Sequence, residues 1–391
     1  MNAVYDHMIA IVFIGIMFVW AVSVIPQMSY NNIQAVNQQQ MRNMELNVFD
    51  SLLLDTGLAT SGTATTTEWG SLNPFTQNAV TRFGLSSAGA STLFTLDPDK
   101  VQRLTDNPLG NLTYERTKQL LGLQGYDFLF QILPPFNVTN ANGTNIDQNH
   151  SPLVVTGSTA EYQIKVSFLD GRPIPNAAIS ATILYTKETT FFPIVTQSTV
   201  TNEMGLGGNT APLATTDPES IMVILRISVA DVATIVVSFG KNSNNIMDIN
   251  MVGDDVILTE PKIPSNAAVW LENMSYYSSD GAVSWLYSGT KDDKINTGSG
   301  NFNLWDQTFN GLKAMDPLFI ILDVSAVEND GVGHGRRELI VAGPYQNLQG
   351  YTVFGYGSTN PGLSTIVSSQ RSVIISGMTY TAQFILWKNS A

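Results

Sequence analysis

The sequence predicts an α+β protein, in which a long N-terminal α-helix precedes a mainly-β head with an immunoglobulin-like β-sandwich and a second β domain. Apolar residues recur at helical spacing through residues 1–57. Short alternating runs of β-branched and aromatic residues fill most of the later chain. We therefore expect a hydrophobic and amphipathic helix at 1–57, a small α+β segment at 58–152, the sandwich at 153–260 and a C-terminal β domain at 261–391.

Composition excludes several classes of function. The chain has 391 residues, a formal net charge of −13 and only 13% charged residues. It has no basic patch that could neutralise phosphates, so we expect neither a nucleic-acid partner nor a docking surface for anionic lipid. It also has no cysteine, which excludes disulfides, thiol catalysis and zinc–thiolate sites.

The predicted first helix begins with an apolar stretch, Met8 to Ile25, which reaches the lower limit of a transmembrane span. Asp6 and His7 precede it where a secretory signal would have basic residues, so we expect the segment to stay on the protein. Pro26 should kink the helix or remove one hydrogen bond.

Beyond Pro26 the helix is expected to continue as an amphipathic rod. Asn, Gln and Ser fill most of its surface, and Gly57 is the expected C-cap. The apolar stripe consists of Ile33, Val36, Met41, Met44, Val48 and Leu52.

A helix that is first apolar and then amphipathic, with an acid near its start and a proline in the twenties, resembles a type IV pilin-like subunit, particularly the archaeal kind. The resemblance implies that the apolar half waits in the membrane and then packs with its copies in a filament core. It also implies that Asp6, in place of the family's usual Glu, neutralises the N-terminal amine of a neighbouring subunit. The family's short basic leader is absent. Either it was removed before residue 1 or this is an uncleaved, anchored relative.

We therefore expect a structural subunit of an extracellular pilus-like filament, inserted in the membrane before assembly and joined to identical subunits through the first helix. The alternative is a single-pass membrane-anchored adhesin or binding protein that does not polymerise. The continuing stripe favours the filament because a simple anchor needs no amphipathic extension, but the stripe could also pack on the protein's own head. The expected assembly residues are Asp6, Ile9, Ile11, Phe13, Ile16, Phe18, Trp20 and Pro26.

The segment at 58–152 has local signals for three elements. Asp97 and Pro98 indicate the start of a short helix, and Thr113 and Gly122 bracket another. Residues 126–133 are predicted to form a strand that is mostly buried on both faces. No partner strand is evident nearby, so we expect this strand to pair with the C-terminal region, which would make the sandwich an insertion in one head.

From Glu161 onward, several strand patterns follow one another at short intervals without cysteine, which predicts the immunoglobulin-like module. A linker at 261–264 and the aromatic-rich C-terminal β domain are expected to follow it. Such modules of prokaryotic surface proteins, which the phrase at 171–183 resembles, generally act as spacers or adhesive surfaces. Five Asn-x-Ser/Thr triplets predict N-linked glycans and a cell-surface location, at Asn111, Asn137, Asn142, Asn149 and Asn273.

No constellation for catalysis is visible, and we expect the protein not to be an enzyme. His334 with Glu328, Asp330 or Glu338 could form a catalytic group, but its Gly-rich surroundings favour a solvated hairpin loop. No nucleophile-elbow, dinucleotide or P-loop pattern occurs. We expect no cofactor. Three acid pairs could each offer two oxygens to a structural Ca²⁺: Asp97 with Asp99, Asp254 with Asp255, and Asp292 with Asp293.

Overall fold

A computed structural model gives the fold. It describes residues 2–105, 109–146, 150–187, 194–241, 247–261, 268–288, 306–315, 317–327, 336–343, 354–359 and 365–389. In the first helix and in some strands, side chains are described for only part of the element. Two of the sequence motifs, the pair Asp292 and Asp293 and the loop around His334, lie outside the described residues.

The predicted α+β class is wrong, because the described head is mostly β. Its strands form six sheets. Apart from α1 (Asn2–Leu54), the described α-helices are only α2 (Pro98–Gln102) and α3 (Tyr114–Leu121), with three single 3₁₀ turns at Trp69–Ser71, Gln77–Ala79 and Lys313–Met315. The segment at 58–152 does not form an α+β layer of its own, because its strands join sheets in different parts of the molecule.

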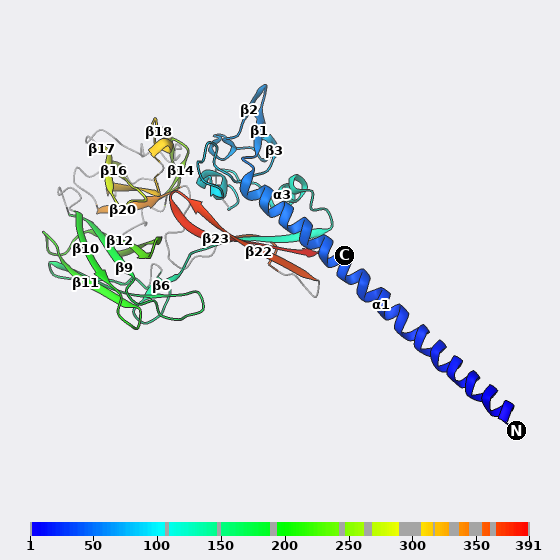
Figure 1. Ribbon diagram of the computed structural model, residues 1–391. Helices are drawn as coiled ribbons and strands as arrows, with labels where there is room; N and C mark the ends of the chain where they lie inside the picture. The colour runs from blue at the N-terminus through cyan, green and yellow to red at the C-terminus, as the bar shows by residue number, and fades with distance from the viewer. Residues whose placement is uncertain are drawn as a thin grey trace.

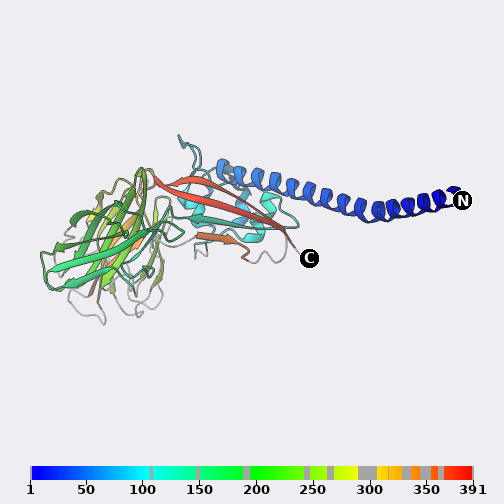
Figure 2. The same cartoon turned by 60° about the horizontal axis from the view of Figure 1, so that its bottom comes forward.

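Helix α1 runs away from the head, with the N-terminus at its far end (Figures 1 and 2). It continues through Pro26 without interruption. Within the part of the chain that is described, no helix has an apolar stretch long enough to cross a membrane, so the expected span is not found there.

The last turns of α1 pack on a five-stranded sheet that joins distant parts of the chain. The strand order is β21-β5-β23-β22-β4, and only the pairing of β4 with β22 is parallel. The predicted strand at 126–133 is β5, which lies between β21 and β23. The bounds are β4 (Thr95–Leu96), β5 (Tyr126–Leu133), β21 (Phe354–Gly357), β22 (Ile366–Ile375) and β23 (Met378–Lys388).

Three contacts fix α1 on this sheet. The rings of Phe49 and Phe384 stack with centroids 5.7 Å apart. The Ser369 hydroxyl donates to Glu45 Oε2 over 2.8 Å, and Arg371 pairs with Asp50 at 3.3 Å. Next to this junction, a small sheet with the order β2-β1-β3 follows the helix, formed by β1 (Leu58–Ser61), β2 (Ala64–Thr66) and β3 (Val80–Arg82).

Between β5 and β21 the chain builds two pairs of sheets. In the first pair, the sheet β10-β9-β12-β13 faces the sheet β11-β8-β6, whose strand β8 also pairs with β7. The bounds are β6 (Asn137–Asn140), β7 (Leu153–Thr156), β8 (Thr159–Ser167), β9 (Ala178–Thr186), β10 (Ile194–Val200), β11 (Leu206–Pro212), β12 (Ser220–Val229) and β13 (Val232–Lys241). Strand β6 begins this sandwich ahead of the expected boundary at 153.

The second pair consists of the sheets β17-β16-β19-β20 and β14-β15-β18. Strands β14 and β15 thus belong here, although their residues fall within the expected sandwich range of 153–260. The bounds are β14 (Met247–Val252), β15 (Asp255–Pro261), β16 (Ala268–Tyr277), β17 (Val283–Ser288), β18 (Asp306–Thr308), β19 (Phe319–Val327) and β20 (Arg336–Ala342).

The two pairs pack on each other as a stack of four sheets. On β12, Val223 and Leu225 face the core shared with β8, whereas Met222 and Ile224 belong to the cluster that contains Leu339 of β20. Polar bonds cross the same boundary, where the Leu339 N–H donates to Ser220 Oγ over 3.1 Å. Both faces of β12 are therefore interior.

Candidate assembly surface and acidic pocket

The apolar half of α1 is a large exposed hydrophobic surface. Its large apolar side chains between Met8 and Val22 are 57–70% exposed. Successive helical residues point 100° apart, so the consecutive apolar residues 11–14 and 16–20 cover the whole circumference. A helix that is apolar all round is normally buried, so this exposed surface is a candidate interaction site.

The predicted assembly residues fall into two groups. Ile9, Ile11, Phe13, Ile16, Phe18 and Trp20 all belong to the exposed surface. The side chains of Asp6 and Pro26 lie outside the described residues.

A polar zone separates this surface from the head. Residues 34–40, which are mainly Gln, Asn, Ala and Val, are exposed, and burial begins only at Met41, where α1 reaches the sheet. Beyond it, Phe49, Leu52 and Leu53 are buried in the head. Of the predicted stripe, the side chain of Ile33 lies outside the described residues and Val36 is exposed. The members from Met41 onward pack on the protein's own sheet.

The glycosylation triplets differ in accessibility. Asn142 is exposed in the turn after β6, and Asn111 and Asn137 are half-buried. Asn149 lies outside the described residues. The prediction for Asn273 is disfavoured, because this residue lies within β16, is 1% exposed and donates from Nδ2 to Asp323 over 3.3 Å. A glycan could not occupy that amide nitrogen in the folded chain.

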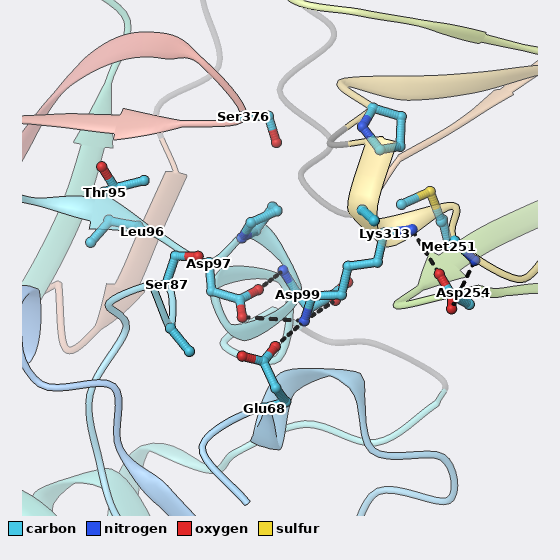
Figure 3. Close-up of a pocket in the computed structure, with 15 residues that line it drawn as sticks. Glu68, Ser87, Thr95, Leu96, Asp97, Asp99, Met251, Asp254, Lys313 and Ser376 are labelled. Carbon is cyan, nitrogen blue, oxygen red and sulfur yellow. Dashed lines mark hydrogen bonds and ion pairs between the residues drawn. The ribbon is translucent and has the colours of Figure 1, made fainter. Parts of the chain in front are cut away.

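One of the acid pairs proposed for calcium, Asp97 with Asp99, meets Asp254 of a second pair at one pocket between α2 and the sheet β14-β15-β18 (Figure 3). Asp255, the other member of that pair, does not line this pocket, and its carboxylate accepts from Asn73 and Thr308. Asp97 is the N-cap of α2, and its Oδ1 accepts the Asp99 N–H over 2.9 Å. Asp99 in turn accepts the Gly253 N–H at 3.1 Å, and Asp254 accepts the N–H of Gly311 and of Lys313.

Lys313 provides a cation to this group of acids. Its Nζ lies 3.5 Å from Asp97 Oδ2 and 3.3 Å from Asp99 Oδ2. It also forms an ion pair with Glu68 and donates to Ser71 Oγ over 2.8 Å. The carboxylates are thus bound by a lysine of the same chain and by backbone N–H groups. Among the described residues no group of three His, Asp or Glu side chains is placed to hold a metal ion.

Two further cations, both on or next to α2, bind the loops that surround the pocket. Lys100 is fully buried and donates to the carbonyl oxygens of Thr56 and Ser86 at 2.9 and 2.7 Å. Arg103 is also fully buried and binds four backbone carbonyls, those of Gly70, Leu72, Leu109 and Gly110. These bonds connect the loops around α2 to the side chains of Lys100 and Arg103.

Burial has the largest effect on the pKa values of Asp97 and Lys100 in this cluster. It raises the pKa of Asp97 to about 6, with a further contribution from the neighbouring Asp99 carboxylate that outweighs Lys313. Burial likewise lowers the pKa of Lys100. Burial also opposes the charge of Lys313, but the carboxylates of Asp97, Asp99 and Glu68 outweigh it and raise the pKa of this lysine.

Sequence reasoning missed this pocket because its parts are far apart in the chain. Glu68, Asp97 and Lys313 come from three segments, and no motif links them. The only available signal was the pair Asp97 and Asp99 beside an N-cap. Of the histidines, His150 is exposed, whereas the side chain of His7 and all of His334 lie outside the described residues.

Comparisons with known proteins show no family. No protein-family model matches the chain, and no curated protein matches it. Alpha-2-macroglobulin of Escherichia coli, activated by porcine elastase, is 11% identical with a TM-score of 0.21, over 61% of this chain and 23% of that one. Human GIVD cytosolic phospholipase A2 in complex with methyl gamma-linolenyl fluorophosphonate is 8% identical with a TM-score of 0.12, over 68% of this chain and 33% of that one. The match thus spans a third or less of each solved chain, and neither TM-score carries an argument about fold or function.

Proposed function

We propose that the chain is a structural subunit of an extracellular, type IV pilin-like filament, in which the apolar half of α1 packs against the same half of other copies. The observation that carries the proposal is the all-round exposure of large apolar side chains from Met8 to Val22. Full burial of a side chain of this kind gains roughly 1.5–3 kcal/mol, and twelve of them, each 57–70% exposed at present, would together gain on the order of 10–25 kcal/mol.

The distribution of these side chains supports several neighbours per helix. A single partner helix covers one stripe, as in a two-stranded coiled coil. Phe13, Ile14, Ile16 and Met17 point to different sides of α1, and each is more than 60% exposed. A bundle that surrounds the helix buries all of these sides, and a helical array of identical subunits supplies such a bundle.

The remainder of α1 fits the same arrangement. Residues 34–40 keep the head away from the apolar half, so several helices can converge while their heads stay apart. The exposed triplet at Asn142 lies on the β part of the chain, which would face outward and carry glycan. The β sheets then form the outer surface of the filament.

The test is a charge in the middle of the apolar half. Ile16→Lys should abolish filaments in electron micrographs of surface material, because an ammonium group in a dry helical core is uncompensated. Circular dichroism should show an unchanged β head, since Ile16 is 61% exposed and contacts none of it.

Gln40→Lys is the matched control, because Gln40 is exposed in the polar part of the same helix and should tolerate the charge. Filaments that persist in Ile16→Lys would contradict the proposal. A stable monomer in native extracts, with no filament in either variant or in the natural chain, would favour the anchored, non-polymerising alternative instead.

A further inference from the structure

The pocket beside α2 contains a buried hydroxyl without a partner. Ser376 lies in the turn between β22 and β23, has a φ of +46° and is 5% exposed. Its Oγ has no hydrogen-bond partner among the described residues. Figure 3 shows this oxygen directed into the pocket, toward the space above Asp97 and Lys313. Leaving such a group unsatisfied costs about 1–3 kcal/mol, so an occupant of the pocket would recover that energy.

The pocket has many acceptors and few free donors. The carboxylates of Glu68, Asp97, Asp99 and Asp254 line it, and each carboxylate has about four lone-pair positions. The Lys313 ammonium is already committed to Glu68, Ser71, Asp97 and Asp99. The two backbone N–H groups beside Asp254 are used by that same side chain. A ligand must therefore bring its own N–H or O–H donors.

The charges of the cluster favour a cation. Four carboxylates line the pocket, and the three cations that contact or stabilise them are Lys100, Arg103 and Lys313. One negative charge is thus left without a cation among these residues. An ammonium group matches this requirement, because it has three donors and no acceptor.

Apart from Ser87 and Thr95, most of the remaining wall is apolar and sets the shape of the ligand. The cavity has a volume of about 510 Å³, which suits a small molecule. Carbon surface is supplied by Leu96, Pro98, Met251, Ala314 and Pro317. An aliphatic chain of a few carbons can lie on this surface while its charged end reaches the acids.

We propose that this pocket binds a primary ammonium group carried on a short aliphatic chain, with Ser376 Oγ and the carboxylates accepting its N–H groups. The proposal goes beyond filament assembly and does not depend on it, because the pocket lies in the head and away from the apolar half of α1. The ammonium group can come from a free amine or from a lysine side chain.

The experiment is calorimetric titration of the full chain with n-butylammonium, with n-butanol as an uncharged probe of the same shape. We expect saturable binding of n-butylammonium, weakened by added salt, and none of n-butanol. Nα-acetyl-lysine amide, titrated in parallel, distinguishes the two sources. Binding of this probe alone would assign the site to a lysine of a protein chain, whereas binding of n-butylammonium would assign it to free amines.

Variants connect binding to the pocket. Ser376→Ala should weaken n-butylammonium about tenfold, the loss of one hydrogen bond to a charged group. Ser372→Ala, at an exposed position on β22, should leave it unchanged. If neither ammonium probe saturates, or if n-butanol binds equally well, the cavity holds only water or apolar solutes and the proposal fails. It also fails if Ser376→Ala, with an unchanged thermal midpoint, binds the probe as the natural chain does.

Discussion

At the scale of single residues, Asp97 and Lys313 show how burial and charge compete. The two groups lie 3.5 Å apart, yet the aspartate favours its neutral form more than usual and the lysine its charged form. The side chain of Asp97 is 2% exposed, so lost hydration dominates, whereas that of Lys313 is 34% exposed and faces several acids. Lys313 therefore offsets part of the cost of burying the acids.

This competition predicts a pH dependence of stability. The pKa of Asp97 is about 6 in the fold against a reference of 3.8, so the folded chain binds this proton more tightly. The stability it contributes is therefore present below about pH 4 and lost as the pH rises through 6. Replacing Asp97 with Asn keeps an N-cap acceptor and removes the titration. Between pH 4 and pH 7 the natural chain should lose on the order of 2 kcal/mol more unfolding free energy than Asp97→Asn, as measured in urea.

Asp231→Asn is the control, because Asp231 is exposed in the turn between β12 and β13. It should follow the pH dependence of the natural chain. If Asp97→Asn does so too, Asp97 does not titrate differently in the folded and unfolded chains.

Accessibility also predicts which triplets carry glycan. Asn142 is exposed in a turn, whereas Asn273 is buried in a central strand and bonded to Asp323. In peptides from native surface material, mass spectrometry should find a glycan on Asn142 and an unmodified Asn273. Modification of Asn273 would mean that the enzyme acts before β16 is buried and that the sheet then forms differently.

At the scale of elements, α1 combines three environments in one continuous helix. The outer part is apolar and exposed, residues 34–40 are polar and exposed, and the part from Met41 is docked on the five-stranded sheet. The docked part carries a buried acid, Glu45, whose pKa burial raises in spite of the bond from Ser369. The docking surface thus combines ring packing with polar bonds, which fixes the rotation of the helix about its axis.

The ring contact predicts how firmly α1 is docked. Phe49 is fully buried against Phe384. Phe49→Ala should cost about 3–5 kcal/mol of unfolding free energy, because it leaves a cavity between the helix and the sheet. Hydrogen exchange should rise first in residues 41–54. Ser51→Ala, on the exposed side of the same turn, should change neither quantity, and equal effects of the two variants would contradict the docking described here.

At the scale of the whole molecule, the stack of four sheets explains why β12 is apolar on both faces. An antiparallel strand at a solvated surface alternates between apolar and polar residues. Residues 221–225 of β12 are all buried, because one face meets β8 and the other meets the second pair of sheets. The two pairs of sheets should therefore unfold together.

Substitutions on opposite faces of β12 test this cooperativity. Ile224→Ala, facing the second pair, and Leu225→Ala, facing β8, should each cost about 2–5 kcal/mol. Each substitution should lower the denaturation midpoint of both pairs of sheets. Segment-resolved hydrogen exchange measures the midpoint of each pair separately. Ile194→Ala on β10, 40% exposed, should cost less than about 1 kcal/mol. Separate transitions for the two pairs in Ile224→Ala would show that they fold independently.

The features that sequence reasoning located correctly are local. The cap of α2 at Asp97, the left-handed C-cap of α3 at Gly122 and the strand at 126–133 are present as expected, because each depends on a few adjacent residues. The fold class failed because it depends on which sheets the strands enter. The pocket was not foreseen because Lys313 meets Glu68 and Asp97 only after the sheets have assembled. Burial of Asn273 was missed for the same reason.

The position of β5 has a consequence for the timing of synthesis. Its neighbours in the sheet are β21 and β23, and the end of β23 emerges about 250 residues after β5. At roughly 5–20 residues per second, on the order of ten to fifty seconds pass before the sheet can close. During that interval Phe128, Phe130 and the side of α1 that packs on β22 and β23 lack their final partners. The nascent chain therefore exposes two apolar surfaces, one on β5 and one on α1. A factor that shields these surfaces until β23 has emerged should therefore raise the yield of this protein.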